Sequence, residues 1–293
     1  MNTSTGSHLP GKVTLTRPEQ ATRAGGELSI TYLGQVGFIL KHRGVSIVID
    51  PYLTDSGDRT PYFERGFWRR NYPPPLKAED LRDIDLVLCS HDHLDHTDPE
   101  TLTGIAEASP RALFAGPRKS TKVIEASGIP TSRIKTLNAD GSTFRFAEAM
   151  IHPVAAAHEE YELDSEGYHS YLSFLIQWGS WTLFHAGDTV CTPELSAELE
   201  NYRIDVAFLP INGRDAARQK LGIVGNMNET EAAALAVRHR VGLVVPTHYD
   251  LCENNAGSLP DFIRELKNAE ASCAYKAFQP GEVKILPALN KVA

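Results

Sequence analysis

Residues 88–98, LCSHDHLDHTD, hold three histidines and three aspartates directly after a short apolar run. The run itself, IDLVLCS over residues 84–90, is nearly continuous in apolar side chains, which is typical of a strand buried on both faces. Asp98, Pro99 and Glu100 then have the order of an N-cap, a first-turn proline and an acidic first turn of a helix. The sequence therefore predicts that the polar cluster forms a strand-to-helix loop in a layered α/β protein.

Other apolar runs predict further strands, and capped stretches between them predict helices. Helices are expected over about 118–127, from Thr192-Pro193, over about 229–240 behind a capping box of Asn228 and Glu231, and in DFIRELKNA. The runs expected to form strands are LSITYLG, GFILKH, VSIVIDP, STFRFAEAMIHPVAAAH (two strands), YLSFLIQWGSWTLFHAGD (a hairpin), IDVAFLPING, VGLVVPTHYD and EVKILPA.

Two segments depart from this pattern. Residues 1–26 are polar and punctuated by glycine and proline, so we expect a flexible N-terminal segment. Residues 52–80 contain four prolines, four arginines and six aromatic residues without a clear period. Long irregular segments within a compact domain are often functional loops, although a loop that only packs on the body is the alternative.

The bulk composition limits the class of protein. The chain of 293 residues is 42% hydrophobic and 23% charged, as expected of a globular protein with a sizeable core. Its net charge of −8 argues against a nucleic-acid or anionic-membrane surface, so we expect no nucleic-acid partner. No apolar stretch approaches the roughly 18 residues of a membrane span, and no secretory leader is expected.

The cysteines indicate a reducing compartment. Cys89, Cys191, Cys252 and Cys273 are scattered without a CxxC pair, so neither a disulfide framework nor a structural zinc site is expected. These observations predict a cytoplasmic protein that acts on a small molecule, and a homo-oligomer is the default assembly.

The cluster after residue 90 has the composition and spacing of a metal site. Residues two apart in an extended chain face the same way, so His91 and His93 can converge on one cation. Asp95 and His96 lie past the bend and can face a second one. Neutral imidazole and carboxylate are ligands that Zn²⁺, Mn²⁺ and Fe²⁺ accept. Three histidines so close together disfavour the alternative, a solvated polar loop.

Three more candidate ligands end apolar runs elsewhere in the chain. They are His158 after VAAA, Asp188 after LFHAG and His248 after LVVPT. Alone, such a histidine is more often a core or loop residue, and an aspartate after glycine is often only a turn. Sites of layered α/β folds form where strand ends share one edge of a sheet. Together with the first cluster, these residues predict one site for one or two divalent ions, Zn or Mn.

This set of residues resembles the metal site of the metallo-β-lactamase superfamily, over about residues 27–290. The resemblance implies an α/β (α+β) fold, a four-layer αββα sandwich, as a single hydrolase domain over residues 27–293. It also implies the ligand sets. The first metal would be bound by His91, His93 and His158, the second by Asp95, His96 and His248, and Asp188 would bridge the two.

Within that superfamily, several short sequence motifs resemble those of the L-ascorbate-6-phosphate lactonase-like branch. They are YLGQVGFIL, IDPYL, SHDHLDH, FHAGDT and VVPTHYDLCENN. This resemblance implies a metal-dependent hydrolase that opens a lactone or a related ester, sugar-phosphate lactones included, by means of a metal-bound hydroxide. It also implies the catalytic residues: Asp188 would orient the nucleophile, and Asp95 would pass a proton to the leaving oxygen.

A phosphorylated substrate needs basic side chains at its pocket. Arg214 is the first candidate because it follows the end of a buried strand, and Arg59, Arg69 and Arg70 are further ones. The alternative for each is a solvated surface arginine. The hydrogen-bonding residues expected to bind a sugar are Asn212, Tyr249, Asn254 and Asn255.

The remaining histidines are expected to have supporting roles. His152 fits strand packing, His185 fits a buried support of the metal ligands, and His169 lies in a segment that could line the cleft.

Other functions stay open. A phosphodiesterase acting on a small or cyclic nucleotide or a phospholipid headgroup would use the same metals, and the aromatic residues over 62–72 could stack bases or cover acyl chains. A secreted β-lactamase, a redox protein of the flavodiiron type and a non-catalytic binding module are disfavoured. The first would need a leader, the second a carboxylate in place of His93, and the third a missing ligand.

Overall fold

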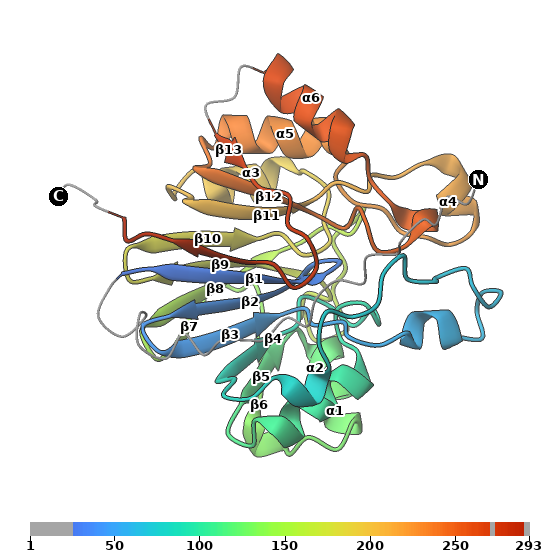
Figure 1. The fold of residues 1–293 in the computed structure, drawn as a ribbon, viewed down its shortest axis with the longest axis vertical. Coiled ribbons are helices and arrows are strands. Elements are labelled where there is room, and N and C mark those ends of the chain that lie inside the picture. The colour runs from blue at the N-terminus through green and yellow to red at the C-terminus, as the bar shows by residue number, and fades with distance from the viewer. Residues whose placement is uncertain (1–25, 270–272, 290–293) are drawn as a thin grey trace, which may run out of the picture.

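Two sheets of seven strands face one another, and helices cover the outer surface of each (Figure 1). This arrangement is the predicted αββα sandwich. The computed structural model describes residues 26–269 and 273–289. The N-terminal segment that we expected to be flexible therefore lies outside the described residues, apart from Gly26.

The first sheet has the strand order β14-β1-β2-β3-β4-β5-β6. Strands β14, β1, β2 and β3 pair antiparallel, and β3 to β6 pair parallel. The bounds are β1 (Leu28–Gly34), β2 (Gly37–His42), β3 (Val45–Ile49), β4 (Leu86–Leu88), β5 (Leu113–Gly116), β6 (Ile134–Thr136) and β14 (Val283–Leu286).

The second sheet repeats this plan with the order β13-β12-β11-β10-β9-β8-β7. Strands β7 to β10 pair antiparallel, and β10 to β13 pair parallel. The bounds are β7 (Phe144–Phe146), β8 (Ala149–Ala155), β9 (Leu172–Trp178), β10 (Trp181–His185), β11 (Val206–Pro210), β12 (Leu243–Thr247) and β13 (Ala274–Tyr275).

Helices cover both outer faces, with α1 and α2 on the first sheet and α3, α5 and α6 on the second (Figure 1). Their bounds are α1 (Pro99–Ala108), α2 (Arg118–Ala126), α3 (Pro193–Leu199), α4 (Ala216–Lys220), α5 (Glu229–Arg238) and α6 (Leu259–Asn268). Short 3-10 helices are η1 (Ser56–Arg59), η2 (Ala78–Asp80), η3 (Thr131–Arg133) and η4 (Glu253–Asn255).

Each sheet is buried on both faces, which explains its continuous apolar runs. Successive side chains of a strand point to opposite faces. Ile47 and Ile49 of β3 accordingly belong to the core between the sheets. Val48, between them, packs towards Leu102 of α1 in the outer layer.

The predicted helix starts are confirmed by their caps. The Asp98 side chain accepts from the N–H of Thr101 at the start of α1. Asn228 and Glu231 form the expected capping box of α5, in which each side chain accepts from the backbone N–H of the other. The short elements β6, β13 and α4 were not predicted, because they have too few residues to show a period.

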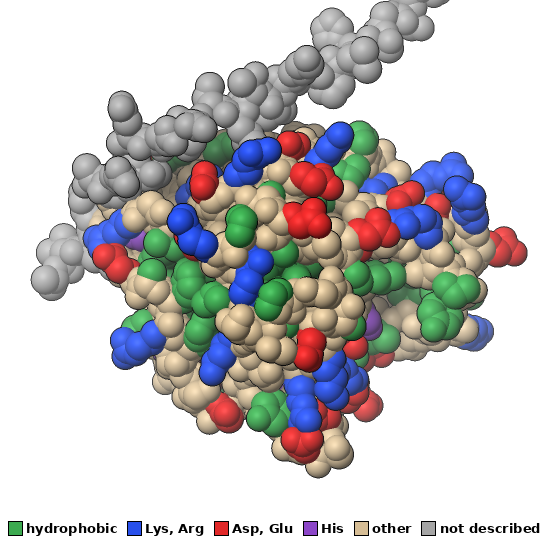
Figure 2. Space-filling model, turned by 90° about the horizontal axis from the view of Figure 1, so that it is seen from below, with side chains coloured by type: hydrophobic (Ala, Val, Ile, Leu, Met, Phe, Trp, Pro, Cys, Tyr) green, Lys and Arg blue, Asp and Glu red, His purple; other side chains and the backbone are tan. Residues whose placement is uncertain are grey.

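Charges are mixed on the face of the molecule shown in Figure 2, where Lys and Arg alternate with Asp and Glu rather than gathering by sign. Among the described residues, no helix has the length and apolar character needed to cross a membrane.

Candidate metal centre

All seven predicted ligands gather at one end of the sandwich, in the loops that follow four strands. His91 to His96 follow β4, His158 follows β8, Asp188 follows β10 and His248 follows β12. The structure groups them into three sets whose ligand atoms lie within 4.8 Å of one another. The sets are His91, His93 and His158; His91, His96 and Asp188; and Asp95, His96 and His248.

Asp188 lies at the centre of this cluster. Its Oδ1 is 3.4 Å from Nε2 of His96, and its Oδ2 is 3.4 Å from Nε2 of His248. Oδ2 is also 3.8 Å from Nε2 of His158. The Asp95 Oδ2 lies 3.5 Å from Nε2 of His248 on the other side. One carboxylate thus touches imidazoles from both predicted ligand sets, which is the position a bridging ligand needs.

Three buried polar atoms of the cluster fit a cation. His91 Nε2, His96 Nε2 and Asp188 Oδ1 have no hydrogen-bond partner within the described part of the chain. A buried polar group without a partner costs roughly 1–3 kcal/mol. A divalent ion at the point where these atoms converge would satisfy them together, and imidazole with carboxylate suits Zn²⁺ or Mn²⁺.

Two histidines of the cluster favour the neutral form that binds metals. Burial lowers the pKa of His91 well below its usual value, and the neighbouring imidazoles of His96 and His93 lower it further. Burial likewise lowers the pKa of His158 to about 4. Both imidazoles are therefore unprotonated at neutral pH and can donate a lone pair to a cation.

The other two buried histidines are held by carboxylates. Burial lowers the pKa of His248, but Asp188 and Asp95 raise it more, to about 9. His96 behaves in the same way and has a raised pKa. The same contacts hold the pKa of both carboxyls below their usual values, although burial opposes this. The imidazoles and the carboxylates therefore favour one another's charged forms in the absence of a cation.

A buried aspartate that the sequence analysis did not single out supports the cluster. Asp50 is fully buried at the end of β3, with a φ of 44°. Its Oδ2 accepts from Nδ1 of His96 at 2.9 Å and from the hydroxyl of Ser90 at 2.7 Å. Its Oδ1 accepts from the Ser90 N–H at 2.7 Å. These bonds fix the ring so that Nε2 of His96 faces Asp188.

The turn between β1 and β2 supports the cluster from the opposite side. Gln35 donates from Nε2 to Oδ2 of Asp95 at 2.8 Å, and the same nitrogen lies 3.2 Å from Nε2 of His248. Its carbonyl accepts from the His248 N–H at 3.0 Å. On the third side, Nδ1 of His158 donates to the carbonyl of Gly225 at 3.0 Å, which directs its Nε2 into the cluster.

A cavity of about 270 Å³ opens directly onto the cluster. Its inner end contains Gln35, His93, Asp95, His158, Asp188 and His248. The rest of the lining comes from the long segment after β3, the loop 222–224 after α4, and Leu251, Cys252 and Asn255 after β12.

A family model for the Beta-lactamase superfamily domain matches residues 46–249 of this chain. The chain belongs to this superfamily. The match runs from β3 to the candidate ligand His248 and its neighbour Tyr249, and so contains every predicted metal ligand.

Relatives of this superfamily member match three quarters or more of its length. A protein of Myxococcus xanthus named UPF0173 metal-dependent hydrolase is 27% identical over 289 residues, which are 96% of this chain and 91% of the relative. A protein of the same name from Pyrobaculum islandicum is 27% identical over 226 residues, covering 76% of this chain and 84% of its own.

Solved structures of low sequence identity share the fold. A novel metallo hydrolase from Ignicoccus hospitalis superposes with a TM-score of 0.67 at 22% identity, over 89% of this chain and 98% of that one. An isothiocyanate hydrolase from Delia radicum gut bacteria gives 0.68 at 16% identity, over 89% and 100%. These likenesses support the αββα sandwich of the beta-lactamase superfamily.

Four of the five residues expected first to bind substrate do not line the cavity of this beta-lactamase superfamily fold. Arg214 makes a bidentate pair with Glu231, both bonds being 2.7 Å, and is not among the residues that line the cavity. Asn212 is buried between Asn226 and Asn255. Tyr249 packs against the core outside the second sheet, and Asn254 donates to the carbonyl of Phe67 at 2.7 Å. Of the predicted sugar-binding residues, Asn255 alone lines the cavity.

The other candidate side chains also have structural partners. Arg59 pairs with Glu100, and Arg70 donates to the carbonyls of Tyr52 and Thr54. His169 lies against Asn138 rather than in the cavity. His185, which was expected to support the metal ligands, donates from Nε2 to the carbonyl of Val36 at 3.0 Å. His152 lies between Thr143 and Gln177 on the strands, as expected of strand packing.

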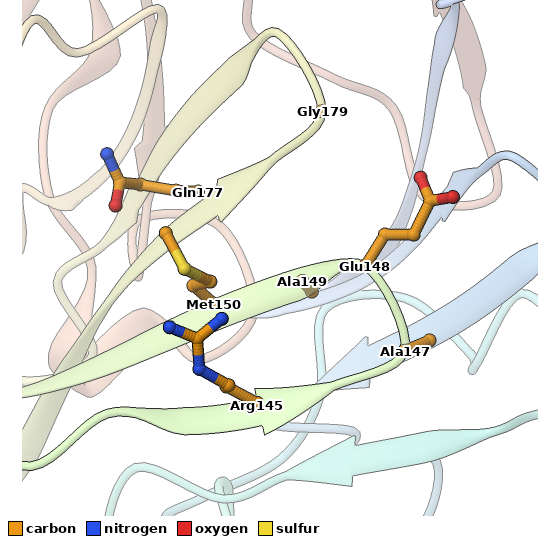
Figure 3. A pocket seen from close by; sticks show the side chains of 7 residues that line it. All are labelled: Arg145, Ala147, Glu148, Ala149, Met150, Gln177 and Gly179. Atoms are coloured by element: carbon orange, nitrogen blue, oxygen red, sulfur yellow. The ribbon is translucent and has the colours of Figure 1, made fainter.

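A second hollow lies at the opposite end of the second sheet (Figure 3). Arg145, Met150 and Gln177 are cross-strand neighbours on β7, β8 and β9, and their side chains extend from one face of the sheet. Gly179 and Ala147 border it from the adjoining turns. None of the predicted ligands lines it, so we place no chemistry there.

Proposed function

We propose that this metal-dependent hydrolase of the beta-lactamase superfamily opens a lactone or hydrolyses a related carboxylic ester. The observation that carries the proposal is the cavity that ends on the histidine–aspartate cluster, where three buried polar atoms lack partners. The resemblance of the site words to the lactonase-like branch supports the ester class.

The proposed ligand sets follow the predicted ones. His91, His93 and His158 would hold one ion, Asp95, His96 and His248 a second, and Asp188 would contact both. Divalent ions there would supply a water of lowered pKa and polarise the substrate oxygen.

The two aspartates have different surroundings, which suits different roles. The Asp188 side chain is 4% exposed and is held from both sides by imidazoles, so it would orient the attacking water. The Asp95 side chain is 29% exposed and borders the cavity. Attack of water on the carbonyl carbon breaks the acyl carbon–oxygen bond, and Asp95 would carry the proton to the departing oxygen. Gln35 would fix its orientation.

The lining of the cavity favours an ester without a phosphate group. Among the described residues, those that line it include no Lys and no Arg. Outside the metal site itself, the negative charge of a phosphate group would therefore have no basic partner in this cavity. Stacking of a nucleotide base on Phe63 or Trp68 would suit the second candidate, a phosphodiesterase, whose substrate carries one charge that the ions can meet.

The test begins with elemental analysis of the purified protein. A panel of lactones and aryl esters is then assayed beside bis-(p-nitrophenyl) phosphate with Mn²⁺ and with Zn²⁺. We expect lactone or ester turnover that His93→Ala abolishes and His152→Ala leaves intact, because His152 lies on the strands away from the cluster. Diester turnover without ester turnover would reject the proposal in favour of the phosphodiesterase. Undiminished activity of His93→Ala would reject the metal site.

A further inference from the structure

We propose that the outer part of the cavity is a preformed apolar subsite that takes an uncharged aromatic or branched aliphatic substituent of the substrate. The inference rests on the proposed function, because it names the part of the ester that lies beyond the carbonyl. It concerns two walls and a floor that come from segments far apart in the sequence.

The first wall is an aromatic cluster in the segment after β3. Tyr62, Phe63 and Trp68 line the cavity. The rings of Phe63 and Phe67 stack at a centroid distance of 4.6 Å, and both meet Trp68 edge-on, at 5.2 and 4.9 Å. Aromatic rings packed in this way form an apolar surface with little freedom to lose on binding.

The second wall is the loop after α4. Ile223 and Val224 line the cavity. The loop is fastened beside them, because the Gly225 carbonyl accepts from Nδ1 of His158 and the Gly225 N–H donates to Glu159 at 2.8 Å. The residue that follows Val224 is therefore hydrogen-bonded to a candidate metal ligand, which holds this wall beside the cluster.

The floor consists of side chains that carry no charge. Tyr52, Leu251 and Cys252 form a small buried cluster against which Trp68 packs. All three also line the cavity. No ionisable group of this floor carries a charge at neutral pH, since burial raises the pKa of Tyr52 and of Cys252 to about 12.

The aromatic wall is held in place by bonds to the segment after β12. The Asn71 N–H donates to the Leu251 carbonyl at 2.7 Å, and its side chain donates to the Asp250 carbonyl at 2.9 Å. Asn254 donates to the Phe67 carbonyl at 2.7 Å. These hydrogen bonds involve residues on both sides of Leu251 and Cys252 in the sequence. We therefore infer that the subsite exists before the substrate binds and loses little entropy on binding.

Among the described residues that line the cavity there is no Lys or Arg to pair with an anionic substituent. The Arg70 guanidinium lies outside this lining, 4.9 Å from the Tyr52 ring centre, and its Nη1 donates to the carbonyls of Tyr52 and Thr54. Asn255 of η4 is a polar residue that lines the cavity. Its Oδ1 accepts from Asn212 and Arg218, both at 3.0 Å, so the group it can offer to a substrate is the donor Nδ2.

The test uses ligands that bind without reacting. Methyl ketones with methyl, isobutyl and benzyl substituents resemble esters but have no leaving group, and phenyl phosphate supplies the charged comparison. Binding to the chelator-treated full chain is followed by tryptophan fluorescence. The signal reports on Trp68, because Trp178 and Trp181 are buried between the sheets. We expect affinity to rise about threefold for each added buried methylene and phenyl phosphate to bind more weakly than the benzyl ketone.

Matched variants place the effect in the subsite. Phe63→Ser and Val224→Ser should each weaken the benzyl ketone at least fivefold, whereas Leu221→Ser should not. Leu221 lies in the same loop, is 54% exposed and does not line the cavity. The circular dichroism spectrum and metal content of each variant show that it is folded.

Each outcome decides one question. Affinity that does not depend on ketone size, or that responds equally to Leu221→Ser, would overturn the subsite. Tighter binding of phenyl phosphate than of benzyl ketone would overturn its uncharged character. Size-dependent ketone binding without turnover of any ester would leave the subsite standing and reject the proposed ester chemistry.

Discussion

Asp50 Oδ2 accepts a hydrogen bond from Nδ1 of His96 at 2.9 Å, while both side chains are fully buried. The carboxylate also accepts two hydrogen bonds from Ser90, so three donors share its two oxygens. This arrangement selects the ring orientation in which Nε2 of His96 is directed at Asp188.

Asp50→Asn should therefore lower metal affinity. The amide has one acceptor oxygen for three donors and no charge to increase the basicity of His96. We expect a 10- to 100-fold loss of affinity, measured by competition with a chromophoric chelator. Asp85→Asn is the control, because Asp85 accepts from the Ser46 N–H at 2.8 Å and does not touch the cluster. Equal affinity of the two variants would mean that Asp50 only supports the fold.

Gly187→Ala should destabilise the protein through a close contact. Gly187 has a φ of 59°, and a Cβ on it would lie 2.9 Å from the Ser90 Cβ. We expect a loss of about 1–3 kcal/mol in urea unfolding, with weaker metal binding because Asp188 is the next residue. Gly167→Ala is the matched control, since its φ is 82° with open space around it. The difference between the variants isolates the contact with Ser90, and no difference would argue against it.

The ion pair between Arg214 and Glu231 should give a pH-dependent part of the stability. Burial raises the pKa of Glu231, but hydrogen bonds from Arg214 and the Asn228 N–H together lower it by more. The net shift of the pKa is therefore downward from 4.5. A carboxyl whose pKa is lowered by folding stabilises the fold at pH values above its pKa in the unfolded chain. This contribution is lost as the pH falls through the pKa of the folded protein.

Glu231→Gln should thus cost about 1 kcal/mol at pH 7 and nothing once Glu231 is protonated below its depressed pKa. Glutamine keeps the capping-box acceptor, so the variant removes mainly the charge. Urea unfolding of both proteins from pH 7 to pH 3 measures the difference. A gap that stays constant with pH would assign the loss to packing.

Metal removal should lower the melting temperature. An ion that binds only the folded chain stabilises it by about 2.7 kcal/mol at a free concentration of one hundred times its Kd. We expect chelation to reduce the Tm by several degrees and restored Zn²⁺ or Mn²⁺ to recover it. In His93→Ala the Tm should respond much less to the chelator. A Tm that chelation leaves unchanged in the parent protein would contradict a metal centre at this cluster.

The long elements and the candidate ligands could be identified from sequence because their signals are local. The runs that form β1, β2 and β3, the cap at Asp98 and the box at Asn228 each lie within a few residues. β13 has two residues and is paired only with β12, so no period could indicate it.

The supporting and substrate residues could not be predicted because they depend on approach in space. Asp50 ends a buried apolar run, as the candidate ligands do, and this signal could have drawn attention to it. Gln35 reaches Asp95 only because the β1–β2 turn lies over the strand ends. Arg214 follows a strand end as expected, yet Glu231 on α5 neutralises it, and this pairing is not a property of either residue alone.

The candidate centre is divided between the two sheets, since β4 leads to four of its ligands and β8, β10 and β12 lead to the other three. Neither half of the sandwich holds a complete set. An ion bound by ligands from both halves would link the two sheets, and its full set of ligands could form only after the sheets pack together. A slight separation of the sheets would then release the ion and abolish activity while each sheet keeps all its strands.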